Sequence, residues 1–267
     1  MSTRTTVWEP GTPCWVDLMT PDPMAANAFY AALFGWQVTD TGPELGHYGI
    51  AVRGGLATAG IGPTQPGTAA PAAWTTYLAT ADVDKTTELI TSNGGFVVSG
   101  PHTVPGQGRM LVAQDPTGAV FGAWQADGMI GAQLVNEPGG LTWNDCHSTD
   151  PATARAFYAA VFGFRYTPME GPFDYTTIDG AGPGSAIGGI GEPDPTLPGA
   201  PSHWTVYFSV PDADTAIATA IALGGAVQTA ATDTPFGRMA TIRDPQGALF
   251  KVMGTVGGSA ASQEQPR

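Results

Sequence analysis

Apolar and polar positions along the chain change their spacing in a regular order, and that order predicts alternating strands and helices. Each half opens with a short run that we expect to be a strand, at residues 14–19 and 142–147, and apolar side chains then recur at helical spacing. Asp22 and Asp150 suit the helix N-cap, because a proline follows each of them and a glycine stands just past the expected helix end. Each half therefore begins with a strand and a capped helix.

The same order restarts inside each half, where a further strand leads into a second helix. We expect these second helices at 83–92 and 213–223, each ending at a glycine pair. An Asp-Pro-x-Gly sequence, which is typical of a type I turn, precedes the last strand of each half. The remaining strands are expected at 47–52, 56–61, 74–79, 96–99, 109–114 and 119–125, and at 175–179, 185–190, 204–210, 226–229, 239–243 and 248–253.

The two halves also repeat each other in sequence. The Trp-Val-Asp of residues 15–17 returns as Trp-Asn-Asp at 143–145, and the helical Ala-Phe-Tyr-Ala-Ala and the late Gly-Arg-Met return at nearly the same offset. A repeat of this length indicates two copies of one domain. We expect domains at 12–126 and 140–254, a linker at 127–139 and a disordered tail at 255–267.

Composition narrows the classes of function. The chain has 267 residues and a formal net charge of −13, so it lacks the basic surface that nucleic-acid binding requires. It contains no apolar run of membrane length and no apolar leader in residues 1–12, so we expect a cytoplasmic protein with no membrane contact. Cys14 and Cys146 do not fall at matching repeat positions, which disfavours a disulfide or a zinc site.

Three motifs occur in both halves: a strand leading to Asp22 or Asp150, a helix ending Phe-Tyr-x-x-x-Phe-Gly, and a late Gly-Arg followed by Asp-Pro-x-Gly. Together they resemble the vicinal oxygen chelate superfamily, which includes glyoxalase I, extradiol dioxygenases and bleomycin-resistance proteins. The resemblance implies an α+β fold of two tandem domains, each made of paired βαβββ units that form a cupped mixed sheet with helices outside. The tandem arrangement is similar to actinobacterial glyoxalase-like proteins, some of them encoded beside aromatic polyketide pathways.

The resemblance also implies metal-ligand positions that face the cup, and this chain departs from them in both copies. The first-strand position is Trp15 or Trp143, and an indole N–H cannot ligate a cation. The final-strand position, usually a glutamate, is Gly122 or Lys251. The third strand of each first unit has no carboxylate, and the strand that opens each second unit offers a threonine. We therefore expect no metal and no other cofactor.

His147 and His203 keep one alternative open. Both lie on expected strands beside the implied ligand positions, and two histidines would begin a metal site if the strand register differed by two residues. The first copy has Met19 and Ala73 instead, and no inward carboxylate completes a usual ligand set. We favour hydrogen-bonding roles for both histidines. If the protein is an enzyme, Asp145, His147 and His203 are the candidate catalytic residues.

Alternation along the strands from Trp15 and Trp143 predicts which side chains line each cup. The predicted ligand-binding residues are Trp15, Asp17, Met19, Thr75, Tyr77 and Trp124 in the first cup, and Trp143, Asp145, His147, His203, Thr205, Tyr207, Lys251 and Met253 in the second. Aromatic rings with a few polar groups suit a flat organic ligand, unless the rings fill the sheet and leave no cavity. The opposite face carries Val16, Leu18, Phe121 and Phe250, which we expect to pack under the helices.

Asp17 and Asp145 recur at the same inward position. A carboxyl group inside an apolar cup has a raised pKa unless it is paired, and it then acts as a base or holds a cationic amine. The alternative for both residues is a structural hydrogen bond. Lys251 is expected to pair with an acid in its own cup, which would make the second site more polar than the first.

Two classes of function follow. The favoured one is a metal-free small-molecule-binding protein of the glyoxalase and bleomycin-resistance type, which sequesters or carries an aromatic or polyketide-like compound, cationic ones included. The alternative is a glyoxalase-like lyase or isomerase, or an oxygenase-associated enzyme, that uses a residual His/Asp site. We expect a monomeric pseudo-dimer or a homodimer, since single-domain members of the resembled family usually dimerise.

Overall fold

The computed structural model describes residues 3–64, 67, 71–182 and 184–254, so the tail predicted at 255–267 lies outside the described residues. The first domain contains β1 (Pro13–Thr20), α1 (Pro23–Phe34), β2 (Gln37–Asp40), the 3-10 helix η1 (Pro43–Leu45), β3 (Gly49–Arg53), β4 (Leu56–Pro63), β5 (Ala73–Ala79), α2 (Val83–Ser92), β6 (Phe96–Val104), β7 (Gly108–Gln114) and β8 (Val120–Ala126). The second contains β9 (Leu141–His147), α3 (Pro151–Phe162), β10 (Tyr166–Pro168), β11 (Tyr175–Asp179), β12 (Ala186–Gly191), β13 (His203–Ser209), α4 (Ala213–Ala222), β14 (Ala226–Thr234), β15 (Gly237–Arg243) and β16 (Leu249–Gly254).

Each domain forms one eight-stranded mixed sheet, and the predicted α+β architecture of two tandem domains is confirmed. The strand orders are β2-β3-β4-β1-β5-β8-β7-β6 and β10-β11-β12-β9-β13-β16-β15-β14, which are equivalent in the two copies. In the first sheet β1 pairs in parallel with β4 and antiparallel with β5. The first strand of each domain therefore lies at the centre of its sheet, where its inward side chains reach the middle of the cup.

The helix signals in the sequence correspond to real caps. The side chains of Asp22 and Asp150 each accept a hydrogen bond from a backbone N–H in the first turn of α1 or α3. Gly35 and Gly163 end these helices in the left-handed region, at φ of 71° and 72°. A side chain at that φ is strained, so glycine is the residue that the helix end requires.

β6 and β14 exceed their predicted lengths by the largest margin. β6 and β14 continue to Val104 and Thr234, about five residues past the expected ends at 99 and 229. The pairing of β6 with β7, and of β14 with β15, shifts register twice within the ladder. Such β-bulges interrupt the alternation of side chains while the strand continues. A prediction based on alternation therefore ends each of these strands too early.

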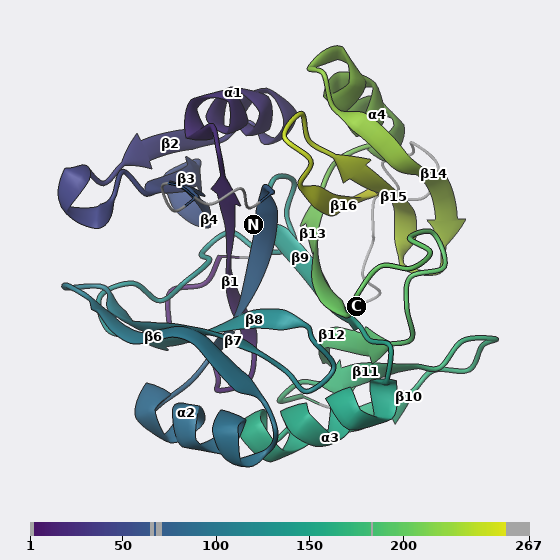
Figure 1. The fold of residues 1–267 in the computed structure, drawn as a ribbon. Coiled ribbons are helices and arrows are strands. Elements are labelled where there is room, and N and C mark those ends of the chain that lie inside the picture. Colours follow the sequence, from purple (N-terminus) through teal and green to yellow (C-terminus); the bar gives the residue numbers. More distant parts are fainter. Residues whose placement is uncertain (1–2, 65–66, 68–70, 183, 255–267) are drawn as a thin grey trace, which may run out of the picture.

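The helices cover the convex faces of the sheets and meet across the domain boundary, with α1 beside α4 and α2 beside α3 (Figure 1). One hydrophobic core joins Tyr30 and Phe34 of α1 with Phe208 and Phe250 of the second domain. Each of these four side chains is at most 4% exposed. The first helix of the chain therefore completes the core of the opposite domain.

The reciprocal arrangement exists at the other end of the molecule. Phe157 and Tyr158 of α3 share a core with Leu78 and Phe121 of the first domain. The residues expected under the helices, Val16, Leu18, Phe121 and Phe250, all have no exposed surface. The two domains therefore form one folded body through their convex faces, and their concave faces point away from this shared core.

A buried hydrogen-bond chain also crosses the domain boundary. The Tyr30 hydroxyl donates to Asp244 Oδ2 over 3.0 Å and accepts from Trp74 Nε1 over 3.1 Å. Tyr30 has no exposed surface. Its removal leaves Asp244 Oδ2 and Trp74 Nε1 without this partner, while Asp244 Oδ1 keeps its bonds to the backbone N–H groups of Gln246 and Ala248.

We expect Tyr30→Phe to lower the free energy of unfolding by about 1–3 kcal/mol, because Asp244 and Trp74 each lose a buried partner. Urea unfolding followed by far-UV circular dichroism measures this loss. Thr167→Val is a suitable control, since it removes a hydrogen bond to Asp179 between exposed residues and should change stability by less than about 0.5 kcal/mol. Equal unfolding midpoints for Tyr30→Phe and the parent protein would contradict the interpretation.

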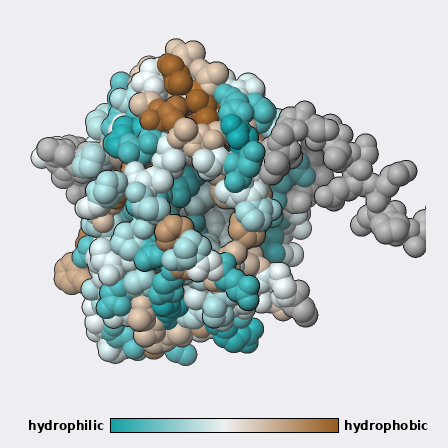
Figure 2. Space-filling view, turned by 90° about the vertical axis from the view of Figure 1, so that its right-hand side faces the viewer, coloured by the Kyte–Doolittle hydropathy of each residue, from teal (hydrophilic) through white to brown (hydrophobic). Residues whose placement is uncertain are grey.

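The surface on the side of α4 and β14 is mostly hydrophilic, and hydrophobic side chains gather over α4 (Figure 2). Ile221 of α4 is 54% exposed.

Within the described part of the chain, no helix combines the length and the apolar character that membrane crossing requires. Cys14 and Cys146 are both buried free thiols, so neither forms a disulfide.

Candidate functional site

Three neighbouring strands meet at the centre of the first cup. Trp15 of β1 pairs with Tyr77 of β5, and Tyr77 pairs with Gly122 of β8. A Cβ at Gly122 would lie 2.1 Å from the Tyr77 ring, so only glycine leaves room for this ring to lie across the sheet. A cavity of about 370 Å³ lies above, walled mainly by Trp15, Tyr48, Ile50, Tyr77, Met110 and Trp124.

Asp17 is the only acid among the described residues that line this cavity. The Tyr77 hydroxyl donates to Asp17 Oδ2 over 3.0 Å, and the Tyr48 hydroxyl lies 3.4 Å from the same oxygen. Trp15 Nε1 donates in turn to the Tyr48 hydroxyl over 2.9 Å. Asp17 Oδ1 is buried and has no hydrogen-bond partner among the described residues. The carboxyl group is thus fixed through one oxygen, and the other remains unpaired.

The environment of Asp17 changes its protonation. Burial raises the pKa of Asp17 from 3.8 to about 7, although the hydrogen bonds from Tyr77 and Tyr48 act in the opposite direction. Near neutral pH the group therefore passes between a neutral acid and a carboxylate. The neutral acid can donate a hydrogen bond to a ligand carbonyl, and the carboxylate attracts a cationic amine. The direction of this pKa shift agrees with the expectation for an acid inside an apolar cup.

The second cup repeats the cluster around Asp145. Trp143 Nε1 and the Tyr175 hydroxyl both donate to Asp145 Oδ1 over 2.7 Å. The Tyr207 hydroxyl donates to Asp145 Oδ2 over 2.5 Å. Both carboxyl oxygens are therefore satisfied within the protein, whereas Asp17 keeps one oxygen without a partner.

Lys251 makes the second cup more polar, as predicted. Its Nζ lies 2.9 Å from Asp194 Oδ2 and donates to the Tyr207 hydroxyl over 3.1 Å. Burial opposes ionisation of Asp194, but the charge and hydrogen bond of Lys251, together with hydrogen bonds from Thr196, outweigh it and hold the pKa of that carboxyl well below its usual value. Gly122 stands at the equivalent position in the first copy. An ammonium group thus occupies the centre of one cup, and the other cup has no side chain there.

His147 and His203 lie side by side on paired strands, with ring centroids 5.4 Å apart. His147 Nδ1 lies 3.2 Å from the carbonyl oxygen of Glu192, and His203 Nδ1 lies 2.8 Å from that of Pro201. Burial lowers the pKa of His147, which favours the neutral ring. Each ring therefore has a local hydrogen bond that accounts for its position.

The predicted residues fall into two groups. In the first copy Trp15, Asp17, Tyr77 and Trp124 line the cavity, whereas Met19 and Thr75 are not among the residues that line it. In the second copy Trp143, Asp145, Tyr207 and Lys251 form one hydrogen-bonded network. The others take strand positions around it, Thr205 opposite Asp145, His203 opposite His147, and Met253 opposite Ser209.

Sequence reasoning missed Tyr48 and Tyr175, which complete the two clusters. Each crosses the sheet over a glycine, since a Cβ at Gly60 or Gly189 would lie 1.7 or 1.9 Å from the tyrosine hydroxyl oxygen. The repeat carried the signal, because both the tyrosine and the glycine recur in the second half. The need for a facing glycine is visible only once the strands are paired.

Comparison with known proteins agrees with this architecture. Residues 14–122 match the family model of the Glyoxalase/Bleomycin resistance protein/Dioxygenase superfamily, and residues 143–253 match that of a glyoxalase-like domain. The chain belongs to this superfamily. The membership expected from the duplicated motifs is therefore confirmed.

Other members of the superfamily resemble the chain over nearly its whole length. The putative glyoxylase CFP32 of Mycobacterium tuberculosis is 43% identical over 250 residues, which cover 91% of this chain and 94% of that protein. The anthracycline biosynthesis proteins DauV of Streptomyces sp. and DnrV of Streptomyces peucetius are 36% and 35% identical over 264 residues, covering 93% of this chain and 94% of each relative.

Solved structures of the superfamily share the fold. The Mn(II)-bound glyoxalase from Novosphingobium aromaticivorans aligns with a TM-score of 0.65 at 16% identity, covering 93% of this chain and 84% of that one. The 2,3-dioxygenase LapB from Pseudomonas sp. KL28 aligns with a TM-score of 0.63 at 13% identity, covering 97% of both chains. At such identities the likeness concerns the fold alone.

The superfamily fold implies a divalent metal in the cup, and the residues present do not fit one. In the first cup Trp15 offers only an N–H donor, and Gly122 offers no side chain and is covered by the Tyr77 ring. In the second cup the Lys251 ammonium stands at the final-strand position, 2.9 Å from Asp194. No group of three or more His, Cys, Asp or Glu side chains able to hold a metal occurs among the described residues.

Proposed function

We propose that the first domain binds a flat aromatic or polyketide-type small molecule in its cup without a metal ion, and that the protein sequesters or carries this compound. The observation that carries the proposal is the cavity of about 370 Å³ whose walls are aromatic and whose polar centre is Asp17. A cavity of this size encloses a small organic molecule, and its rings supply stacking area.

Asp17 supplies the anchor that a purely apolar cavity lacks. Its Oδ1 has no partner in the part of the chain that the structure describes, and its Oδ2 is held by Tyr77 and Tyr48. A ligand hydroxyl or amine that reaches Oδ1 satisfies a buried acceptor, so a ligand with such a group binds more tightly than one without. The chemistry of this cavity therefore favours hydroxylated or amino-substituted aromatic compounds.

The relatives support two candidate functions. The names of DauV and DnrV connect two full-length relatives with anthracycline biosynthesis, in accord with a polyketide-derived aromatic ligand. The name of CFP32 supports the second candidate, a glyoxalase-like lyase or isomerase. The chemistry of both cups favours the first candidate, because the residues at the implied ligand positions do not suit a divalent metal ion.

We expect Trp15→Ala to weaken binding of an anthracycline aglycone at least about tenfold, since the lost aromatic contact is worth on the order of 1.5 kcal/mol. The measurement is an isothermal titration of the purified protein. Trp143→Ala is the matched control, because it changes the equivalent position of the second cup and should leave the affinity within about twofold. Unchanged affinity in Trp15→Ala would contradict the proposal that the ligand binds in the cavity of the first cup.

Metal analysis and an activity assay separate the two candidate functions. Protein as purified should carry well under one equivalent of divalent metal and should not convert a methylglyoxal–thiol adduct. One equivalent of metal, together with turnover that His203→Ala or Asp145→Ala abolishes, would establish the enzyme instead.

A further inference from the structure

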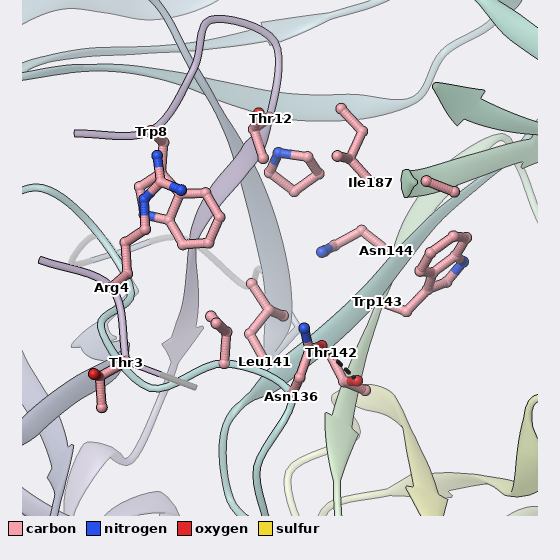
Figure 3. Close-up of a pocket in the computed structure, with 13 residues that line it drawn as sticks. Thr3, Arg4, Trp8, Thr12, Asn136, Leu141, Thr142, Trp143, Asn144 and Ile187 are labelled. Atoms are coloured by element: carbon pink, nitrogen blue, oxygen red, sulfur yellow. Dashed lines mark hydrogen bonds between the residues drawn. The ribbon is translucent and has the colours of Figure 1, made fainter. Parts of the chain in front are cut away.

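A second pocket, also of about 370 Å³, lies where the two domains meet. The N-terminal segment with Arg4 and Trp8 forms one wall, and Asn136 of the linker and Asn144 of β9 face it (Figure 3). Ile187 at the start of β12 adds an apolar surface. The pocket therefore draws on parts of the chain far apart in sequence, and it shares no lining residue with the first cup.

Arg4 is positioned as an available cation. Its guanidinium lies over the Trp8 ring, 4.6 Å from the ring centroid. Its Nε donates to the carbonyl oxygen of Thr6 over 3.0 Å, and its Nη2 to that of Val7 over 2.7 Å. Its Nη1 has no hydrogen-bond partner, and no carboxylate lies within ion-pair distance, among the described residues. By contrast, Arg109 is paired with Asp84.

The two asparagines present donors to the same space. The Thr76 hydroxyl donates to Asn144 Oδ1 over 2.8 Å, and the Thr142 hydroxyl donates to Asn136 Oδ1 over 3.0 Å. Both amide oxygens are thus used inside the protein, and the amide nitrogens of Asn144 and Asn136 point into the pocket (Figure 3). An amide whose oxygen is already bonded offers only N–H donors to a ligand.

The repeat shows that the fold does not require this polar pair. Asn144 and Thr76 have Val16 and Val206 at the equivalent positions of the other copy. In the sheets Val16 pairs with Thr76, and Val206 pairs with Asn144, so each sheet has one polar residue beside one valine at this place. Asn144 is only 2% exposed. The fold accepts valine at this position, and burying an amide instead costs free energy unless its polar atoms find hydrogen-bond partners. The partner that the amide N–H group lacks among the described residues can be a ligand.

We propose that this interdomain pocket binds a small aromatic carboxylate, whose anionic group is held by Arg4 and the amides of Asn136 and Asn144. The described lining residues include one cation, two amides and no acid, in a chain with a net charge of −13. Trp8, Leu141 and Ile187 supply the apolar contact for the body of the ligand. The site is independent of the first cup and of the function proposed for it.

The test compares 2-naphthoate with its neutral analogue 2-naphthamide by isothermal titration on the full chain. Charge-assisted hydrogen bonds predict that Arg4→Gln weakens naphthoate binding at least about tenfold and changes naphthamide binding less than about twofold. The double variant Thr76→Val with Asn144→Val installs the residues of the other copy, so it should fold normally and still lose naphthoate binding. In the parent protein, naphthoate should shift the side-chain amide NMR signals of Asn144 and Asn136.

Three results would overturn the proposal. The first is equal affinity for naphthoate and naphthamide, and the second is unchanged naphthoate binding in Arg4→Gln. The third is loss of naphthoate binding in Trp15→Ala, which would place the probe in the first cup. Anthracycline binding in that same variant tests the cup separately, so failure of one proposal is distinguishable from failure of the other.

Discussion

Replacing Phe250 with alanine should lower the free energy of unfolding by about 3–5 kcal/mol and should unfold both domains in one transition. Phe250 belongs to the second domain and has no exposed surface. Its ring lies 5.5 Å from that of Tyr30 and 5.9 Å from that of Phe34, both on α1 of the first domain (centroid distances). The cavity left by truncation therefore weakens the contact that joins the domains as well as the core of one of them.

The duplication supplies a matched variant for this experiment. Phe121 is the equivalent residue of the first domain, and its ring lies 5.4 Å from that of Tyr158 on α3. Phe121→Ala should cost a similar free energy and should also give a single transition. Phe236, which is 62% exposed, is the control, and its change to alanine should cost less than about 0.5 kcal/mol.

Urea unfolding followed by tryptophan fluorescence and by far-UV circular dichroism measures these effects. Coincident transitions by both probes, displaced to lower urea in the two core variants, are the expected outcome. Separate transitions for the two domains in Phe250→Ala would show that the shared core does not couple them.

Replacing Asp17 with asparagine should remove about 3 kcal/mol of the change in unfolding free energy between pH 5 and pH 8. The folded protein keeps the proton of Asp17 up to about pH 7, because burial raises the pKa of this group from 3.8. The unfolded chain releases that proton near pH 4. Asp17 therefore stabilises the fold less as the pH rises from about 4 through 7, and the loss persists above pH 7.

Asparagine keeps an oxygen for Tyr77 and carries no charge, so its contribution does not depend on pH. The difference between the variant and the parent protein isolates Asp17, because other groups, including His147, titrate in both. Asp84→Asn is the control: a hydrogen bond from Arg109 lowers the pKa of Asp84, so this carboxyl does not titrate between pH 5 and pH 8. An identical pH dependence in Asp17→Asn and the parent would contradict the protonation assigned to Asp17.

Much of the concave face followed from the sequence because strands impose a strict alternation. Once Trp15 and Trp143 were placed inward, Asp17 and Asp145 had to follow, and the structure brings both acids beside those tryptophans. The capped helices were equally predictable, since proline and glycine have local conformational requirements. The predicted raised pKa of Asp17 needed only its position in an apolar cup.

Other features depend on contacts that no local pattern contains. Tyr48, just before β3, and Tyr175, at the start of β11, reach Asp17 and Asp145 only once the strands are paired into a sheet. The insertion of α1 into the core of the opposite domain depends on how two complete sheets pack. The interdomain pocket combines Arg4 with a linker residue and a strand residue more than 130 positions away, so it exists only in the assembled molecule.

The packing of α1 and α3 into each other's domains has a consequence for how the duplicated copies diverge. A substitution on a convex face must be accepted by both copies, because that face is also the core of the other copy. The concave faces are under no such joint constraint. Gly122 and Lys251 occupy the equivalent position in the two cups. The same fold therefore carries two different cup interiors within one chain. Exchanging inward residues between the copies is therefore a route to redesigning either interior while the shared body stays intact.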